Sequence, residues 1–224
     1  MPTSPVLIAA AASALGIAKP SIEHSLRGLR EAGLIRVSGR GPYASQMTFQ
    51  DASRLLIGVC GAAPLERNAA SNAVEVFETL RLANETIDGT DEVATGQGPL
   101  SKLAEEHSFG QAFQSLLEVA GDDCLFSSMG GRSEKTDSEL KRMIAILGYV
   151  RVEFFRPVPV TRIIYQLVAI GRQVLTYGKN IGDDTSRYSG IVRDQMNCGR
   201  IEITTITEEV LWEVGKSITG TSHN

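Results

Sequence analysis

The stretch SALGIAKPSIEHSLRGLREAGLIRVSGRGPYASQMTF, residues 13–49, carries the clearest folding pattern in the chain. It continues an alanine-rich segment over 4–15 that is typical of a helix. Gly16 supplies the backbone freedom for a tight turn, and Pro20 marks the start of the next helix. In that second helix three apolar residues recur at i, i+4 and i+7: Ile22, Leu26 and Leu29. The pattern predicts two helices that meet at a tight turn, with one face of the second helix buried.

The segment after Gly33 predicts a β-hairpin followed by a third helix. Residues 34–49 place apolar runs on both sides of a glycine-containing loop, which favours two short strands. Thr48 and Asp51 then have the spacing of a helix-capping box. The order helix, helix, hairpin, helix is complete by about residue 60. We therefore expect one domain over 1–60 and a second over 61–224.

Charge is unevenly divided along the chain. The whole sequence has a formal net charge of -4, yet its first 58 residues hold six basic and three acidic side chains. The basic residues are Lys19, Arg27, Arg30, Arg36, Arg40 and Arg54. A basic end on an acidic body suits a protein that presents one surface to phosphate and repels phosphate elsewhere.

The second helix carries residue types that read DNA. On the side away from its apolar face, His24 and Arg27 suit base edges, whereas Lys19, Ser21 and Arg30 suit phosphates. Two arginines and a tyrosine lie around the hairpin loop, where they suit contact with the DNA backbone or a narrow minor groove. The complete set of expected DNA-binding residues is Lys19, Ser21, His24, Ser25, Arg27, Gly28, Arg30, Arg36, Arg40 and Tyr43.

The segment ALGIAKPSIEHSLRGLREAGLI, followed by RVSGRG, resembles the winged helix-turn-helix of bacterial transcriptional regulators. The resemblance covers about the first quarter of the chain. It implies sequence-specific binding to duplex DNA, with the second helix in the major groove and the hairpin as the wing. A dimer would favour an inverted repeat, and repression by promoter occlusion is the simplest outcome. The next segment, MTFQDASRLLIGV, is similar to one found in regulators of prophages and mobile elements.

The remaining three quarters of the chain resemble no family, but their patterns predict an α+β unit with an antiparallel sheet. Helical patterns cover about 66–83 and 101–119, and residues 149–178 are rich in β-branched and aromatic side chains typical of two or three strands. A last strand enters a helix capped by Thr207. We expect five residues in the core or a dimer interface: Phe154, Phe155, Leu211, Trp212 and Val214.

No catalytic set is evident, so we expect no enzymatic activity, cofactor or metal. The three cysteines, Cys60, Cys124 and Cys198, lack disulfide or zinc spacing and are expected to be reduced thiols in the cytoplasm. An inert Cys198 is favoured over a redox sensor, although two arginines lie near it in the sequence. His107 is expected to be solvated or half-buried. No segment is long and apolar enough to cross a membrane, and no effector ligand is indicated.

Two alternative functions remain open on the sequence. The first is a phage or plasmid factor for DNA packaging or replication, which would use the same module to bind duplex DNA. The second is a protein-interaction module, because winged helices also dock protein partners. Charge reversal of Arg27 and Arg40 separates DNA binding from protein docking, since only DNA binding depends steeply on these charges and on salt.

Overall fold

The computed structural model describes residues 3–37, 46–63, 68–88, 100, 103, 106–126, 148–167, 171–178 and 202–220. Within these ranges the chain forms helices and one antiparallel sheet, which confirms the predicted α+β class. The helices are α1 (Ser4–Leu15), α2 (Lys19–Glu31), α3 (Phe49–Cys60), α4 (Ala69–Phe77), α5 (Phe109–Gly121) and α8 (Glu208–Thr219). The strands are β1 (Leu82–Asp88), β2 (Gly148–Arg156), β3 (Val160–Leu167), β4 (Gly171–Gly178) and β5 (Glu202–Thr207).

The five strands lie in the order β1-β4-β3-β2-β5, and all neighbours are antiparallel. Alternate residues of β2 are buried, as expected for a strand with one face on the core. The register places Phe154 of β2 opposite Thr161 of β3, and Thr161 opposite Tyr177 of β4. These residues therefore share one face of the sheet.

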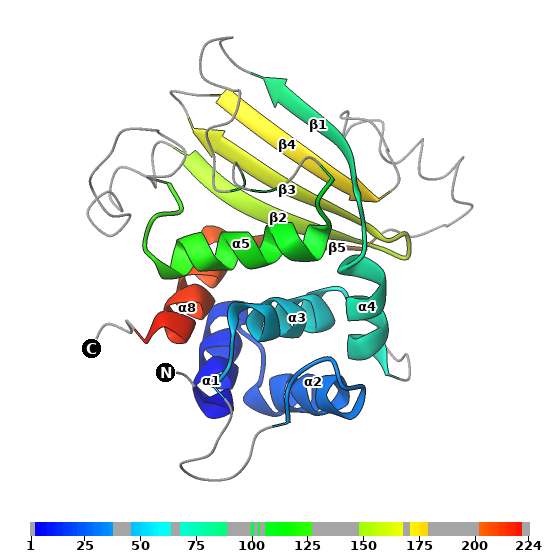
Figure 1. The fold of residues 1–224 in the computed structure, drawn as a ribbon, viewed down its shortest axis with the longest axis vertical. Helices are drawn as coiled ribbons and strands as arrows, with labels where there is room; N and C mark the ends of the chain where they lie inside the picture. Colours follow the sequence, from blue (N-terminus) through cyan, green and yellow to red (C-terminus); the bar gives the residue numbers. More distant parts are fainter. Residues whose placement is uncertain are drawn as a thin grey trace.

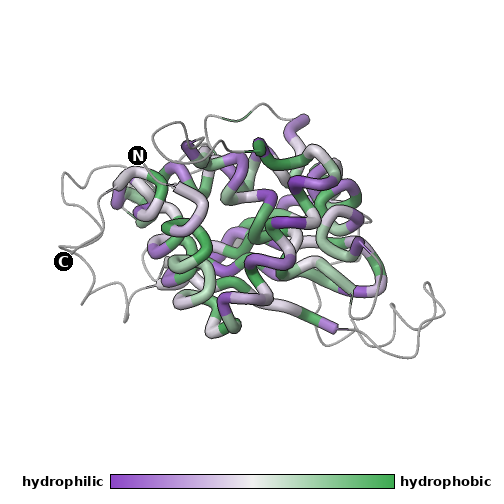
Figure 2. The backbone as a smooth tube through the Cα atoms, turned by 90° about the horizontal axis from the view of Figure 1, so that it is seen from below, coloured by the Kyte–Doolittle hydropathy of each residue, from purple (hydrophilic) through white to green (hydrophobic). Residues whose placement is uncertain are grey.

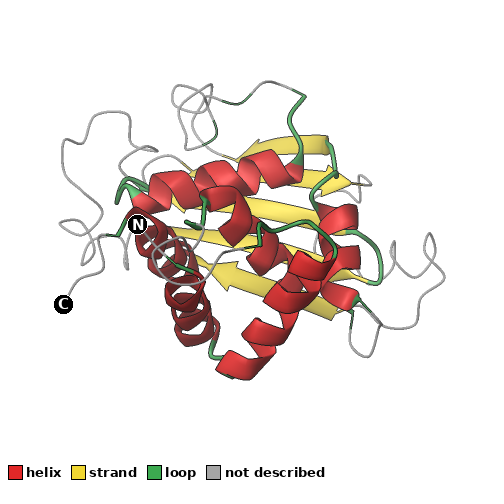
Figure 3. Ribbon diagram, turned by 60° about the horizontal axis from the view of Figure 1, so that its bottom comes forward, coloured by secondary structure: helices red, strands yellow, loops and turns green. Residues whose placement is uncertain are grey.

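That face is covered by helices, which gather on one side of the sheet (Figures 1 and 3). Phe154 is the centre of the contact. Its ring lies 5.6 Å from the ring centroid of Phe77 in α4, and 5.5 Å and 6.1 Å from those of Phe109 and Phe113 in α5. Edge-on aromatic packing of this kind stabilises a core beyond the area that it buries. The five residues predicted for the core or an interface, Phe154, Phe155, Leu211, Trp212 and Val214, are all buried within the chain.

The helices form more than one layer below the sheet. α5 packs against α8 and α3, while α1 packs against α8. α2 contacts α1, α3 and α4 and lies at the end of the molecule opposite the sheet (Figure 1). One cluster of buried apolar residues runs from Leu7 in α1 to Ile218 in α8. The N-terminal helices and the C-terminal part of the chain thus share a core.

Local signals in the N-terminal quarter correspond to observed helix ends. The predicted helix over 4–15 matches α1, and Gly16 ends it in the left-handed conformation at φ 64°. α3 begins with the predicted capping box, in which Thr48 and Asp51 bond each other's backbone amides. Thr207 stands at the predicted N-cap position of α8, although its side chain makes no capping hydrogen bond. These devices use only neighbouring residues, which is why the sequence reveals them.

Two predicted helices were wrong in extent. The expected helix over 66–83 is α4, which ends at Phe77, and the chain then enters β1 at the edge of the sheet. The helix expected from residue 101 begins only at Phe109, after a capping box formed by Ser108 and Gln111. Pairing with β4 decided the first change, because strand hydrogen bonds from a distant segment override local helix preference.

The described ends of the predicted hairpin contain no strand. Residues 34–37 and 46–48 lie outside any helix or strand, and the loop between them lies outside the described residues. The wing is therefore not among the described elements.

Hydrophilic and hydrophobic residues alternate along the helices on the side seen in Figure 2. This is the pattern of amphipathic helices with one buried face. In the described parts of the chain, no helix is long and apolar enough to span a bilayer.

Candidate nucleic-acid interface

α2 is held by the apolar face that the sequence predicts. Ile22, Leu26 and Leu29 are all buried, and the helix rests on α1 and α3. The turn from α1 to α2 spans only the residues between Leu15 and Lys19, and Gly16 donates its backbone amide to α1 carbonyls. Packing and the short turn together fix which face of α2 points outward.

The outward face of α2 carries most of the predicted contact residues. Lys19, Ser21, His24 and Arg27 are exposed, and Ser25 and Gly28 are half-buried. A Cβ atom added to Gly28 would meet no heavy atom within 4 Å. No described element therefore approaches α2 at Gly28, and packing among the described residues does not explain a glycine there.

Arg30 differs from the other predicted contacts. Its guanidinium donates a hydrogen bond to the hydroxyl of Ser4 at the start of α1, and that hydroxyl in turn lies 3.5 Å from the sulfur of Met47. The side chain is half-buried. Arg30 thus links α2 to α1, a role that its position within the helix sequence did not indicate.

Arg54, counted with the basic end, is also a structural residue. Its Nε donates to the carboxylate of Glu78 at 3.0 Å, and Nη1 donates to the carbonyl of Leu34 at 2.7 Å. These contacts hold the chain that leaves α2 against α3 and α4. Among the residues predicted around the hairpin, Arg36 is exposed, while Arg40 and Tyr43 lie outside the described residues.

Two acidic residues flank the basic surface. Glu23 and Glu31 are exposed and lie one helical turn on either side of Arg27. Both carboxylates repel a nearby phosphate. A glutamate that reaches a base edge can, in contrast, accept a hydrogen bond from the amino group of cytosine. The exposed side chains of α2 therefore carry two basic and two acidic charges, and the surface is mixed in chemistry.

A separate polar pair lies on the covered face of the sheet. His107 is buried, which corrects the prediction of a solvated or half-buried residue. Its Nε2 lies 2.7 Å from the hydroxyl of Tyr177 in β4. Burial, with a smaller effect of Glu85, raises the pKa of Tyr177 well above its usual range. The partner of His107 is 70 residues away, so no local pattern could indicate it.

The described cysteines show no sign of a reactive site. Burial raises the pKa of the Cys60 thiol to about 12, although the nearby Arg156 guanidinium opposes the shift. Cys124 is partly exposed, and Cys198 lies outside the described residues. In the described ranges, no cluster of three or more histidine, cysteine or acidic side chains is arranged to hold a metal ion.

Comparison of the chain with protein-family models, with curated proteins and with solved structures found no match in any of the three. The interpretation of the α2 surface therefore depends on its own chemistry.

Proposed function

We propose that this protein is a duplex-DNA-binding transcriptional regulator that acts as a dimeric repressor, with α2 as the helix that enters the major groove. The observation that carries the proposal is the exposed surface of α2, which lies at the end of the molecule opposite the sheet (Figure 1) and carries Lys19, Ser21, His24 and Arg27. Helix-turn-helix proteins present the N-terminal part of their second helix to base edges in this way.

The order of residue types along α2 supports the same function. Lys19 and Ser21 stand in the first turn, where a helix N-terminus favours a phosphate. His24 and Arg27 follow one and two turns later, where side chains reach base edges. Arg30 keeps α1 and α2 together and positions this surface. On this proposal, Arg40 and Tyr43 remain candidate wing contacts, and a small-molecule effector would act through the rest of the chain.

The first experiment is selection of binding sites from a random duplex library, followed by titration of the selected duplex at several salt concentrations. We expect enrichment of an inverted repeat with half-sites about one helical turn apart. Arg27→Ala should weaken binding by about 1–3 kcal/mol and relax sequence preference at one position of the half-site. Lys19→Ala should weaken binding to all sequences alike and reduce the salt slope by about one.

The chain offers matched controls for this experiment. Arg151→Ala removes an equal charge from an exposed position on β2, and it should leave DNA binding unchanged. Glu31→Gln removes a negative charge one turn from Arg27, and it should strengthen binding. Loss of affinity in Arg151→Ala equal to that in Arg27→Ala would mean that net charge alone governs binding. No enrichment from the library, with no salt-dependent binding, would exclude a regulator of this kind and favour a protein-docking role for α2.

A further inference from the structure

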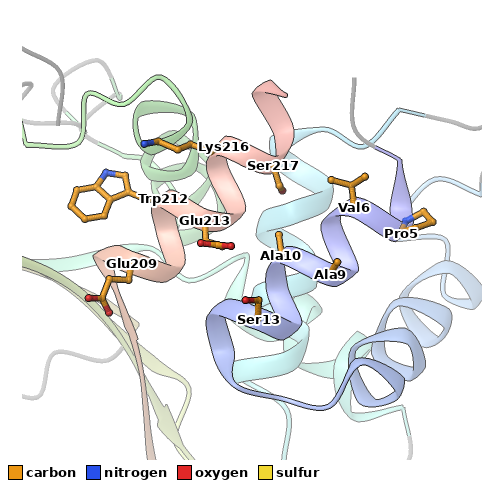
Figure 4. A pocket seen from close by; sticks show the side chains of 10 residues that line it. All are labelled: Pro5, Val6, Ala9, Ala10, Ser13, Glu209, Trp212, Glu213, Lys216 and Ser217. Carbon is orange, nitrogen blue, oxygen red and sulfur yellow. The ribbon is translucent and has the colours of Figure 1, made fainter. Parts of the chain in front are cut away.

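A groove lies between α1 and α8, the first and last helices described. Its volume is about 820 Å³, within the range of sites that hold small organic ligands. Figure 4 shows the two helices side by side, with the side chains of Val6, Ala9 and Ala10 on α1 and those of Glu213 and Ser217 on α8 between them. Trp212 and Glu209 line the groove farther from α1.

The α1 side of the groove is apolar and accessible. Val6 is 46% exposed, one of the few large apolar side chains of the described chain that is not covered. Small side chains at Ala9 and Ala10 leave the space beside it open. A ligand with an apolar body would gain free energy by covering this surface.

The α8 side of the groove is acidic. Glu209 and Glu213 are exposed and lie one helical turn apart. Lys216 also lines the groove, and its Nζ lies 2.5 Å from a carboxylate oxygen of Asp123 just beyond α5. Two carboxylates and one ammonium line the groove, which therefore has an excess of negative charge.

We propose that this groove binds a lipophilic organic cation: an apolar or aromatic body seated on α1, with its positive charge at Glu213 and Glu209. A second copy of the chain suits the groove less well, since a two-fold contact through it would bring the carboxylates of both copies together. The regulatory consequence rests on the proposed function, because α1 is the helix that supports α2. A ligand that contacts α1 and α8 together changes how α1 and α2 are held against the rest of the molecule.

The experiment compares two probe ions of the same shape and opposite charge, tetraphenylphosphonium and tetraphenylborate. The chain has one tryptophan, Trp212, which lines the groove and packs against Phe126, so its emission reports on changes in this part of the molecule. We expect saturable binding of tetraphenylphosphonium with a change in Trp212 emission, and binding of tetraphenylborate weaker by at least about tenfold.

Charge variants give the decisive comparison. Glu209→Gln with Glu213→Gln should weaken binding of the phosphonium by at least about tenfold and should not weaken binding of the borate. The matched control is Glu75→Gln with Glu106→Gln, which removes two exposed charges outside the groove and should bind both ions as the wild type does. Ala9→Leu narrows the groove without changing its charge, and it should weaken the binding of both ions.

The proposal would be overturned if the two ions bind equally tightly, or if the phosphonium binds the double glutamine variant as tightly as the wild type. DNA titrations of the same samples separate it from the proposed function. If the phosphonium binds through the carboxylates while no duplex is bound, the groove proposal stands and the regulator proposal fails. If duplex binding is intact and the two ions bind alike, the regulator proposal stands and the groove proposal fails.

Discussion

At the scale of single residues, several buried polar side chains have partners that are far away in the sequence. His107 and Tyr177 form a buried hydrogen bond that joins the segment before α5 to β4. Cys60 lies at the end of α3 beside Arg156, which ends β2. Burial determines the hydrogen bonding and the pKa of these groups. Substitutions and titrations at them therefore report on whether the core is intact.

Tyr177→Phe should destabilise the protein by about 1–3 kcal/mol, because it leaves a buried ring nitrogen of His107 without this partner. The measurement is the free energy of unfolding in urea. Tyr149→Phe is a suitable control, since Tyr149 is only half-buried and its ring lies beside Arg151. Equal effects of the two substitutions would show that the hydrogen bond contributes nothing.

The thiol of Cys60 should make stability depend on alkaline pH. In the folded protein its pKa is about 12, above the ordinary value of 9.0, so the folded state keeps a proton that the unfolded state loses. Stabilisation from this group is complete below pH 9 and falls by up to ~1.4 kcal/mol per pH unit as the pH rises toward 12. Urea titrations at pH 8 and pH 10 should therefore show a smaller difference between wild type and Cys60→Ala at pH 10. A difference that does not change with pH would contradict the burial of the thiol.

At the scale of elements, two glycines show opposite uses of the same residue. Gly215 of α8 lies where α8 crosses α5, and an added Cβ would stand 2.7 Å from the carbonyl oxygen of Leu117 and 2.7 Å from the amide nitrogen of Gly121. Both neighbours are backbone atoms, so they cannot move without separating the helices. Gly28 of α2, in contrast, has no heavy atom of the described residues within 4 Å of an added Cβ.

Gly215→Ala should lower the free energy of unfolding by at least about 2 kcal/mol, because the two helices must move apart to accept the methyl group. Thermal and urea unfolding measure the effect. Gly220→Ala is the comparison for an exposed glycine: its φ of 79° strains alanine, but no atom of the described residues lies within 4 Å of the added group. A stability of Gly215→Ala equal to that of the wild type would mean that α5 and α8 are not in close contact.

Gly28→Ala should stabilise the free protein by about 0.5–1 kcal/mol, since alanine is the better helix former and its methyl group meets no atom of the described residues. If α2 lies in the major groove, the same methyl group meets the DNA, so affinity for the selected duplex should fall. Unfolding and DNA titration of one sample test both statements. If the variant is more stable and its affinity for the selected duplex is unchanged, this part of α2 does not contact the DNA.

At the scale of the whole molecule, α2 and the sheet lie at opposite ends of a shared core (Figure 1). α1 packs against α8, and α3 packs against α5, so the helices that present α2 are held by the C-terminal half of the chain. The boundary near residue 60 stays a prediction. Its consequence for folding is measurable, because domains with separate cores unfold separately and a shared core unfolds as a unit.

We expect a single cooperative unfolding transition. Leu7→Ala, in α1, should cost about 2–5 kcal/mol, because Leu7 is fully buried in the shared core. Helical circular dichroism and the fluorescence of Trp212 in α8 should follow one curve and shift together in the variant. Val6→Ala, at an exposed neighbouring position, is the control. Two separated transitions, with the fluorescence unaffected by Leu7→Ala, would establish an independent N-terminal domain.

Sequence patterns alone determined the features that depend on neighbouring residues. The limits of α1, the buried face of α2, the capping box of α3 and the strand that enters α8 all follow from spacings of a few residues. The outward face of α2 was predictable for the same reason, since a buried stripe on a helix leaves the opposite side exposed.

Only the tertiary structure decided the features that join distant segments. β1 became a strand because β4 pairs with it, and His107 became buried because Tyr177 meets it. Arg30 contacts Ser4 across the helix pair, and Arg54 contacts Glu78 across α3 and α4. The groove between α1 and α8 exists because the first and last described helices pack side by side. Such contacts depend on how the whole chain buries its apolar surface, a property that no short stretch of sequence contains.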